Sequence, residues 1–228
     1  MMTTIPNCGG RGHRAPVLAA NLVACVVFGV GLALAQGSPS PTPAAGAPPE
    51  AKAAPGKGAM EKPAGKKEVA VIKTTMGTIV FEFLPDVAPK MVENFKSLAR
   101  EGFYNGTTFH RVIHDFMIQG GDPLSKDNDP NNDGSGDGPR KMPAEFTTKY
   151  KHVRGMVSTA RMGNDVNSGS CQFFIVQKDY PSLDNQYTIF GRVLEGMDVV
   201  DAISQVPKGR NDRPLTNVVM EKVTIEAR

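Results

Sequence analysis

The sequence predicts an all-β domain, either a barrel or a sandwich, over residues 69–228 of the 228-residue chain. Short runs rich in Val, Ile, Thr and Phe recur from residue 69 onward, with Gly, Pro, Asn and Asp between them. Only two segments of the same region have the spacing of an amphipathic helix. Many short strands with two helices argue against a parallel sheet wound with alternating helices.

A hairpin is predicted first. Residues 69–75 and 78–84 are β-rich runs, and only Met76 and Gly77 separate them. A two-residue connection containing glycine is typical of a tight hairpin. We therefore expect these two strands to pair antiparallel.

A helix is predicted next, because Pro89 suits a first helical turn and Gly102 suits a helix end. The apolar residues between them recur on one face; they are Val92, Phe95, Leu98 and Ala99. The remaining elements are six strand-like runs and one short helix. The strands are expected at residues 107–113, 117–119, 155–160, 173–177, 188–194 and 217–226, and the helix at residues 197–203.

The positive charge lies outside this domain. The chain has 26 Lys+Arg, 23 Asp+Glu and a net charge of +3. Residues 1–68 hold seven bases and three acids, which leaves 19 bases and 20 acids in residues 69–228. A domain with one net negative charge has no general affinity for nucleic acid.

The N-terminal 35 residues resemble a secretory signal peptide. No charge occurs from residue 15 to residue 35, and Ala33 and Ala35 give the small-x-small pattern that precedes cleavage. The alternatives are an uncleaved membrane anchor and lipid attachment at Cys25. Residues 36–68 are rich in Pro, Ala, Gly, Ser and Lys, which predicts a disordered linker. We expect an exported protein, periplasmic or anchored in the membrane and facing the periplasm.

Cysteine usage agrees with this organisation, because a cleaved leader removes Cys8 and Cys25 and leaves Cys171 without a disulfide partner. Cys171 has two readings. It is either a thiol nucleophile paired with His110 or His152, or a small buried residue, and the second is favoured.

Four motifs carry a resemblance to a known family. They are FHRVI at residues 109–113 and FMIQGGD at residues 116–122, followed in order by SCQFFI at 170–175 and LDNQY at 183–187. The chain resembles the cyclophilin family of peptidyl-prolyl cis-trans isomerases over nearly all of residues 69–228. The resemblance implies a closed eight-stranded antiparallel barrel capped by two α-helices, a substrate groove on its outside, and no cofactor.

Arg111 matches the catalytic arginine of that family. The peptide bond resists rotation with a barrier of about 18–20 kcal/mol because resonance gives it double-bond character. No covalent bond breaks, so a donor aimed at the prolyl nitrogen and an apolar slot for the ring suffice. A guanidinium stays charged and offers several N–H donors. The alternative for Arg111 is a surface ion pair.

The resemblance implies a proline pocket made by Phe116, Met117, Phe174 and Leu183. Taken alone, each of these residues would be interpreted as core. Gln119 and Phe116 join Arg111 in the expected catalytic set, with Gln119 holding the substrate backbone near the rotating bond. Ordinary strand polarity is the alternative for Gln119.

The other expected substrate contacts surround this set. Gln172 would hold substrate backbone, and Ala160 and Arg161 match a stretch whose backbone pairs with an extended peptide. His110 adjoins Arg111 and either lines the groove or is a hydrogen-bonded structural histidine. Tyr187 stands where many eukaryotic members have histidine.

Two departures from the eukaryotic pattern point to a bacterial form. Ser182 occupies the position of a pocket tryptophan, and the chain contains no Trp. Together with Tyr187, this puts tight cyclosporin binding in doubt more than catalysis.

The acidic loop at residues 126–138 is not explained by isomerase chemistry. Its spacing resembles the front half of a calcium loop, although Arg140 replaces the closing Glu. The weak calcium candidates are Asp129, Asn131, Asp133 and Asp137. A solvated acidic loop is the favoured alternative.

The expected function is therefore prolyl isomerisation that assists the folding of exported proteins, whose X-Pro bonds otherwise equilibrate over tens to hundreds of seconds. Expected partners are proline-containing polypeptides, with no nucleic acid and with a membrane tether possible through the N-terminal segment. A monomer is expected. The alternative is a non-enzymatic module that binds proline segments in the same groove.

Overall fold

The computed structural model describes residues 67–127 and 129–228. The predicted signal peptide or anchor at residues 1–35, and nearly all of the predicted linker at residues 36–68, lie outside the described residues. Within the described part, no helix has the length and hydrophobicity needed to cross a bilayer.

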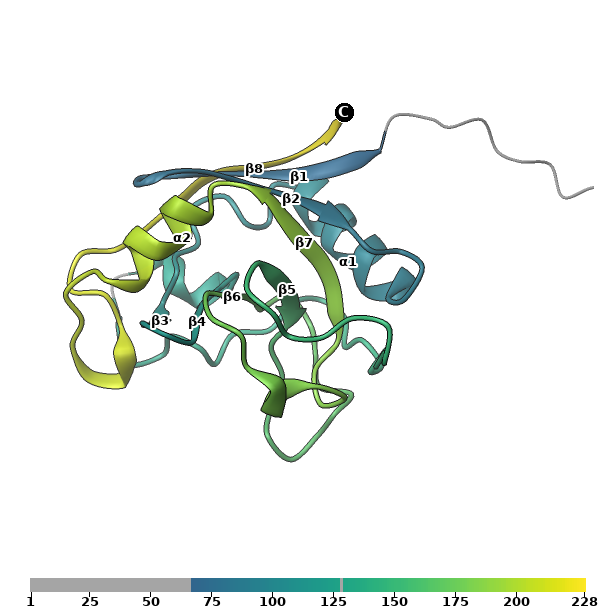
Figure 1. Cartoon of the computed structure of the whole chain (residues 1–228). Coiled ribbons are helices and arrows are strands. Elements are labelled where there is room, and N and C mark those ends of the chain that lie inside the picture. Colours follow the sequence, from purple (N-terminus) through teal and green to yellow (C-terminus); the bar gives the residue numbers. More distant parts are fainter. Residues whose placement is uncertain (1–66, 128) are drawn as a thin grey trace, which may run out of the picture. The chain divides into compact units, whose positions relative to one another are not determined.

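Eight strands form one antiparallel sheet in the described part of the chain, as the resemblance to cyclophilins implies and the sequence pattern alone did not decide. They are β1 (Glu68–Thr74), β2 (Gly77–Phe83), β3 (Arg111–Ile113), β4 (Met117–Gly120), β5 (Met156–Thr159), β6 (Phe173–Val176), β7 (Ile189–Glu195) and β8 (Met220–Ala227). Their order across the sheet is β3-β4-β6-β5-β7-β2-β1-β8. Figure 1 shows β8, β1 and β2 side by side, with β7 curving away from them towards β5.

The expected closed barrel is wrong, because the sheet curls into a half-barrel whose edge strands β3 and β8 do not form a ladder. The strand expected at residues 107–113 is regular only from Arg111 onward. Its first half meets the start of β8 through one isolated bridge, Thr108–Val219. The amide of Phe109 donates to the Val218 carbonyl over 2.9 Å beside that bridge.

Two α-helices pack against the sheet, close to the predicted ranges. They are α1 (Pro89–Arg100) and α2 (Met197–Ser204), and three 3-10 turns, η1 (Pro123–Lys126), η2 (Pro181–Leu183) and η3 (Arg210–Asp212), lie in the loops. The first turn of α1 lacks a local side-chain cap. Instead, the Glu145 carboxylate accepts from the amides of Lys90 and Met91 over 3.1 and 2.9 Å.

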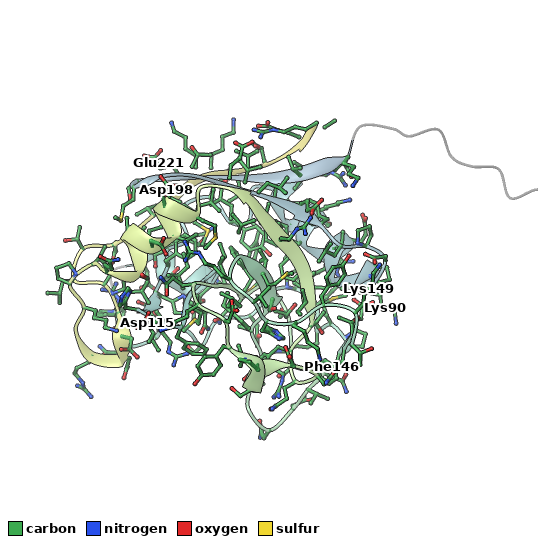
Figure 2. All side chains as sticks on the ribbon, viewed as in Figure 1. Lys90, Asp115, Phe146, Lys149, Asp198 and Glu221 are labelled. Carbon is green, nitrogen blue, oxygen red and sulfur yellow. The ribbon has the colours of Figure 1, made fainter. Side chains whose placement is uncertain are left out.

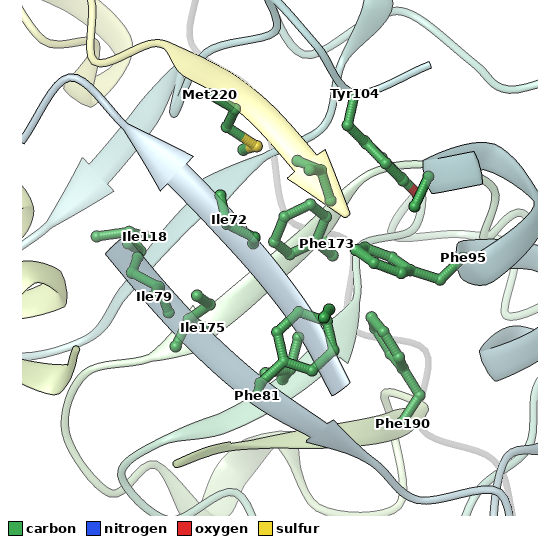
Figure 3. Packing of buried hydrophobic residues seen from close by; sticks show 14 of the residues in the cluster. Ile72, Ile79, Phe81, Phe95, Tyr104, Ile118, Phe173, Ile175, Phe190 and Met220 are labelled. Atoms are coloured by element: carbon green, nitrogen blue, oxygen red, sulfur yellow. The ribbon is translucent and has the colours of Figure 1, made fainter. Parts of the chain in front are cut away.

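The hydrophobic core on the concave side of the sheet is here called the inner cluster, and Figure 3 shows part of it. Its buried members are Ala70, Ile72, Ile79, Phe81, Phe83, Ala88, Met91, Val92, Phe95, Leu98, Ala99, Tyr104, Phe109, Val112, Ile118, Val157, Cys171, Phe173, Ile175, Phe190, Val200, Ile203, Val218, Met220 and Val223. Phe95 of α1 lies at its centre and stacks on Tyr104 with ring centroids 4.7 Å apart. Its ring also meets Phe81, Phe173 and Phe190 within 5.6 Å. Aromatic packing of this density anchors α1 to the sheet.

The outer cluster is a second, smaller group of buried apolar side chains. Its buried members are Leu84, Met117, Met156, Phe174, Val176 and Ile189, and its partly buried members are Val87, Ile113, Phe116, Tyr150, Ala160, Leu183 and Tyr187. Charged side chains such as Lys149 and Asp115 lie at the periphery of the domain (Figure 2).

Candidate functional site

The β3–β4 hairpin places Arg111 on the outer face of the sheet. Arg111 lies opposite Gln119, and Val112 lies opposite Ile118. Side chains alternate between faces along a strand, while directly opposed residues share a face. Val112 and Ile118 belong to the inner cluster, so Arg111 and Gln119 project to the other side.

The same row continues across two more strands. Gln119 pairs with Phe174 of β6, and Phe174 pairs with Ser158 of β5. Arg111, Gln119 and Phe174 therefore stand side by side on one face. Strand register alone brings together residues that are 63 positions apart in the chain.

A pocket of about 110 Å³, here called the Arg111 pocket, lies over this row. It is lined by Arg111, Phe116, Met117, Gln119, Ala160, Arg161, Phe174, Leu183 and Tyr187. The structure thus brings together nine of the predicted site residues. His110 and Gln172 do not line this pocket.

The apolar side of the pocket is the open rim of the outer cluster. Phe174 is 5% exposed and packs edge-on against Tyr187, with ring centroids 5.5 Å apart. Phe116 packs against Tyr180 at 4.3 Å. Sequence reasoning missed Tyr180, and the only available signal was an aromatic residue two positions before Ser182.

Arg111 has no ion-pair or hydrogen-bond partner for its guanidinium in residues 67–127 and 129–228, although it is half-buried. Arg154 differs sharply, because its guanidinium binds both carboxylate oxygens of Asp201 over 2.6 and 2.7 Å. The surface ion pair considered for Arg111 is therefore absent from the described residues. An unpaired donor beside apolar side chains interacts strongly with any acceptor that enters the pocket.

Gln119 is held in place by Gln172. The Gln119 amide nitrogen donates to the Gln172 side-chain oxygen over 3.0 Å. The Gln172 nitrogen donates in turn to the carbonyls of Gly134 and Gly136 over 3.0 and 2.8 Å. Because both N–H donors of Gln172 are in use and its oxygen accepts from Gln119, Gln172 positions Gln119. Gln172 also lines a cavity of about 220 Å³ together with Gln119 and Ala160, and its contact with substrate backbone stays a prediction.

Ala160 and Arg161 form the edge of the pocket beside β5. The Ala160 amide donates to the Gln172 carbonyl over 2.9 Å, and the Ala160 carbonyl accepts no backbone hydrogen bond in the described part of the chain. The Arg161 guanidinium lies 4.6 Å from the centroid of the Tyr187 ring and donates to the Gln186 carbonyl over 2.9 Å. This stacking fixes Tyr187 at the pocket rim.

Comparison with known proteins identifies the domain. Residues 69–225 match the family model described as cyclophilin type peptidyl-prolyl cis-trans isomerase. The chain belongs to the cyclophilin family.

Relatives of the cyclophilin domain carry the same description. Peptidyl-prolyl cis-trans isomerase-like 1 of Neurospora crassa is 41% identical over 155 residues, which are 68% of this chain and 91% of that protein. Peptidyl-prolyl cis-trans isomerase CYP71 of Arabidopsis thaliana is 41% identical over 162 residues, which are 69% of this chain but only 24% of that protein. The domain is a peptidyl-prolyl cis-trans isomerase domain.

A solved structure has the same fold. The cyclophilin type peptidyl-prolyl cis-trans isomerase of Cryptosporidium parvum, crystallised in the presence of the dipeptide Ala-Pro, is 29% identical and matches with a TM-score of 0.65. The match covers 70% of this chain and 99% of that one.

Two histidines of the cyclophilin domain are buried near the site. His152 lies behind Phe174, with ring centroids 6.2 Å apart, and its Nδ1 is 3.0 Å from an Asp184 carboxylate oxygen. Burial lowers the pKa of His152 and also that of His110, while nearby carboxylates oppose both shifts. His110 does not reach the Arg111 pocket but lines a neighbouring cleft.

The calcium candidates do not converge in the cyclophilin domain. Asp133 pairs with Arg213, and Asp137 pairs with Lys141 over 2.6 Å. The Asp129 carboxylate accepts from its own loop. Among the described residues, no three acidic, His or Cys side chains are grouped for metal binding.

Cys171 is fully buried, and burial raises the pKa of its thiol to about 12. A thiol that stays protonated at neutral pH is a poor nucleophile. The structure agrees with the interpretation of Cys171 as a packing residue.

Proposed function

We propose that residues 69–228 accelerate rotation about X-Pro bonds in the Arg111 pocket. The observation that carries this proposal is the half-buried, unpaired guanidinium of Arg111 beside an apolar pocket. The pocket volume of about 110 Å³ suits a small ring such as that of proline. Support also comes from the relative that was crystallised with Ala-Pro.

In the proposed mechanism, Phe116, Met117, Phe174 and Leu183 hold the proline ring while the preceding carbonyl group turns. Twisting the C–N bond ends its resonance and leaves the lone pair of the prolyl nitrogen free to accept a hydrogen bond. Arg111 donates an N–H to that lone pair. This interaction exists only in the twisted state, so it lowers the barrier without tightening ground-state binding.

Gln119 supports the same state by holding substrate backbone next to the rotating bond. Its orientation depends on Gln172, which is fixed by two loop carbonyls. A preorganised amide needs no reorientation when the substrate twists.

The first test measures isomerisation of a proline peptide by exchange NMR with the domain and with two variants. Arg111→Ala should lower kcat/KM about 100- to 1,000-fold, the range seen when a single transition-state donor is removed. Arg111→Lys keeps the charge but loses the planar fork, so it should not restore the rate. Arg154→Ala is the control, because Arg154 is a surface arginine with a carboxylate partner.

The alternative is a module that binds proline segments without turnover. It predicts peptide binding by the wild-type domain with no increase in the rate of exchange between the cis and trans forms of the peptide. Unchanged turnover in Arg111→Ala would instead rule out the role given to Arg111.

We further propose that the protein is a bacterial, exported, monomeric isomerase that assists the folding of exported proteins. The uncharged run at residues 15–35 and the Ala33–Ala35 pattern support export. Mass spectrometry of the protein isolated from its host tests this, because a mature N-terminus at Gln36 is expected after cleavage. An intact N-terminus in a soluble fraction would contradict export.

A further inference from the structure

A second cleft lies on the other side of Arg111 and has no part in the proposed mechanism. Its volume is about 400 Å³, and we call it the Arg213 cleft. It is lined by His110, Arg111, Gln119, Pro130, Asp133, Gly134, Ser135, Asn211 and Arg213. It shares Arg111 and Gln119 with the Arg111 pocket, so the two cavities adjoin at these side chains.

The wall of the cleft is fixed to β3. Lys208 donates to the Val112 carbonyl over 3.1 Å and pairs with Asp212 over 3.1 Å. Asn211 and Asp212 have φ values of 58° and 57°, a left-handed conformation that Asn and Asp adopt more readily than other non-glycine residues. The η3 turn is therefore fixed by its own residues and by the contacts of Lys208.

The ion pair between Arg213 and Asp133 leaves N–H donors of Arg213 available to the cleft. Arg213 donates through Nε to Asp133, whose side chain is 7% exposed, while the Arg213 side chain is 22% exposed. In the described part of the chain, neither Nη group of Arg213 donates a hydrogen bond. Among the residues that line the cleft, Arg213 neutralises Asp133, which leaves the guanidinium of Arg111 as the unbalanced charge.

We propose that the Arg213 cleft binds an acidic side chain of the substrate, within two residues of the proline, on the segment that leaves the pocket past Arg111. An extended chain advances about 3.3 Å per residue, so the first two flanking residues reach a cleft that shares two lining residues with the pocket. A carboxylate accepts from the Nη groups of Arg213 in the geometry that a guanidinium favours. This inference rests on the proposed isomerase function.

The experiment compares four blocked peptides by exchange NMR at low ionic strength. Two place the charge after the proline, Ala-Ala-Pro-Glu and Ala-Ala-Pro-Gln, and two place it before, Glu-Ala-Pro-Ala and Gln-Ala-Pro-Ala. We expect kcat/KM to favour Glu over Gln about threefold to fivefold at one of the two positions, the range of an exposed ion pair. The preference should disappear at about 1 M salt, where the Debye length is about 3 Å.

Two variants with opposite expected effects exclude a general disturbance of the loop. Arg213→Gln should abolish the preference for Glu, whereas Asp133→Asn frees the guanidinium from its partner and should increase the preference. Arg210→Gln is the matched control, because Arg210 lies in the same turn and does not line the cleft.

Equal rates for Glu and Gln at both positions would overturn the inference, as would a preference that survives Arg213→Gln or high salt. These outcomes differ from failure of the proposed function. If the domain were not an isomerase acting in the Arg111 pocket, the two Gln peptides would not be isomerised either.

Discussion

On strands β3 to β7, the inner and outer clusters take alternate residues of the same strands, yet only the outer one forms a binding surface. Phe173 faces inward and is fully buried, whereas its neighbour Phe174 faces outward and lines the Arg111 pocket. Val112 and Arg111 divide in the same way on β3. A two-residue period thus gives β3, β4 and β6 one face that packs in the core and one face that carries pocket residues.

The clusters also differ in how completely they are sealed. Residues of the inner cluster pack on all sides against the sheet or α1, as Phe95 does against four aromatic rings. The outer cluster ends in half-buried side chains such as Phe116 and Tyr187. We therefore expect inner-cluster changes to alter stability and outer-cluster changes to alter substrate binding.

Phe95→Ala should have the largest effect on stability. Truncation of a fully buried phenylalanine costs about 3–5 kcal/mol because it combines lost burial with a new cavity. For about 160 residues this lowers Tm by about 10 °C or more. Thermal unfolding followed by circular dichroism measures it, and kcat/KM at 10 °C should stay near the wild-type value for the folded fraction. A loss of less than about 1 kcal/mol in the free energy of unfolding would mean that the inner cluster repacks around the smaller side chain.

Phe174→Ala should lower activity more than it lowers stability, the reverse of Phe95→Ala. The change removes an apolar side chain that lines the Arg111 pocket, so kcat/KM should fall at least about tenfold. The free energy of unfolding should fall less than in Phe95→Ala, because the pocket beside Phe174 is already open to solvent. Val176→Ala is the control, because Val176 belongs to the outer cluster but does not line the pocket. Equal rate losses in both variants would show that the whole cluster, and not the pocket wall, limits activity.

The division into clusters was only partly predictable from sequence. The run of aromatic and β-branched residues at 173–177 predicted a strand, but an unbroken apolar run does not reveal which face meets the core. Phe174 was assigned to a site only through the resemblance to cyclophilins. The closed barrel was expected only from the resemblance, and it was wrong because the two ends of the sheet meet at the isolated bridge Thr108–Val219 and not along a ladder.

Contacts between distant loops were also invisible in the sequence. The cap that Glu145 provides to α1 spans more than 50 residues. Saturation of the Gln172 amide by Gly134 and Gly136 likewise depends on how the acidic loop folds over β6. Neither contact has a local motif, and both determine how the site is held.

Tyr180→Ala should have a smaller effect than Phe174→Ala. Tyr180 supports Phe116 from outside the pocket and is 40% exposed. An aromatic pair contributes about 0.5–1.5 kcal/mol beyond its buried area, so KM should rise a few-fold with little change in kcat. Tyr180→Phe keeps the ring and should restore KM. Failure of this rescue would assign the effect to the hydroxyl group.

The smallest expected effect is a dependence of the free energy of unfolding on pH that arises from the two buried histidines next to the site, His152 and His110. Burial lowers the pKa of His152, behind Phe174, and of His110, beside Arg111, below the ordinary value of 6.5. The unfolded chain therefore takes up protons as the pH falls below about 6.5 while the folded domain resists them, so the free energy of unfolding decreases until the folded-state pKa is passed. Urea unfolding between pH 5 and pH 7.5 measures this slope. His152→Gln and His110→Gln should each reduce it, and the double variant should reduce it most. A slope that is unchanged in the double variant would show that neither buried histidine resists protonation.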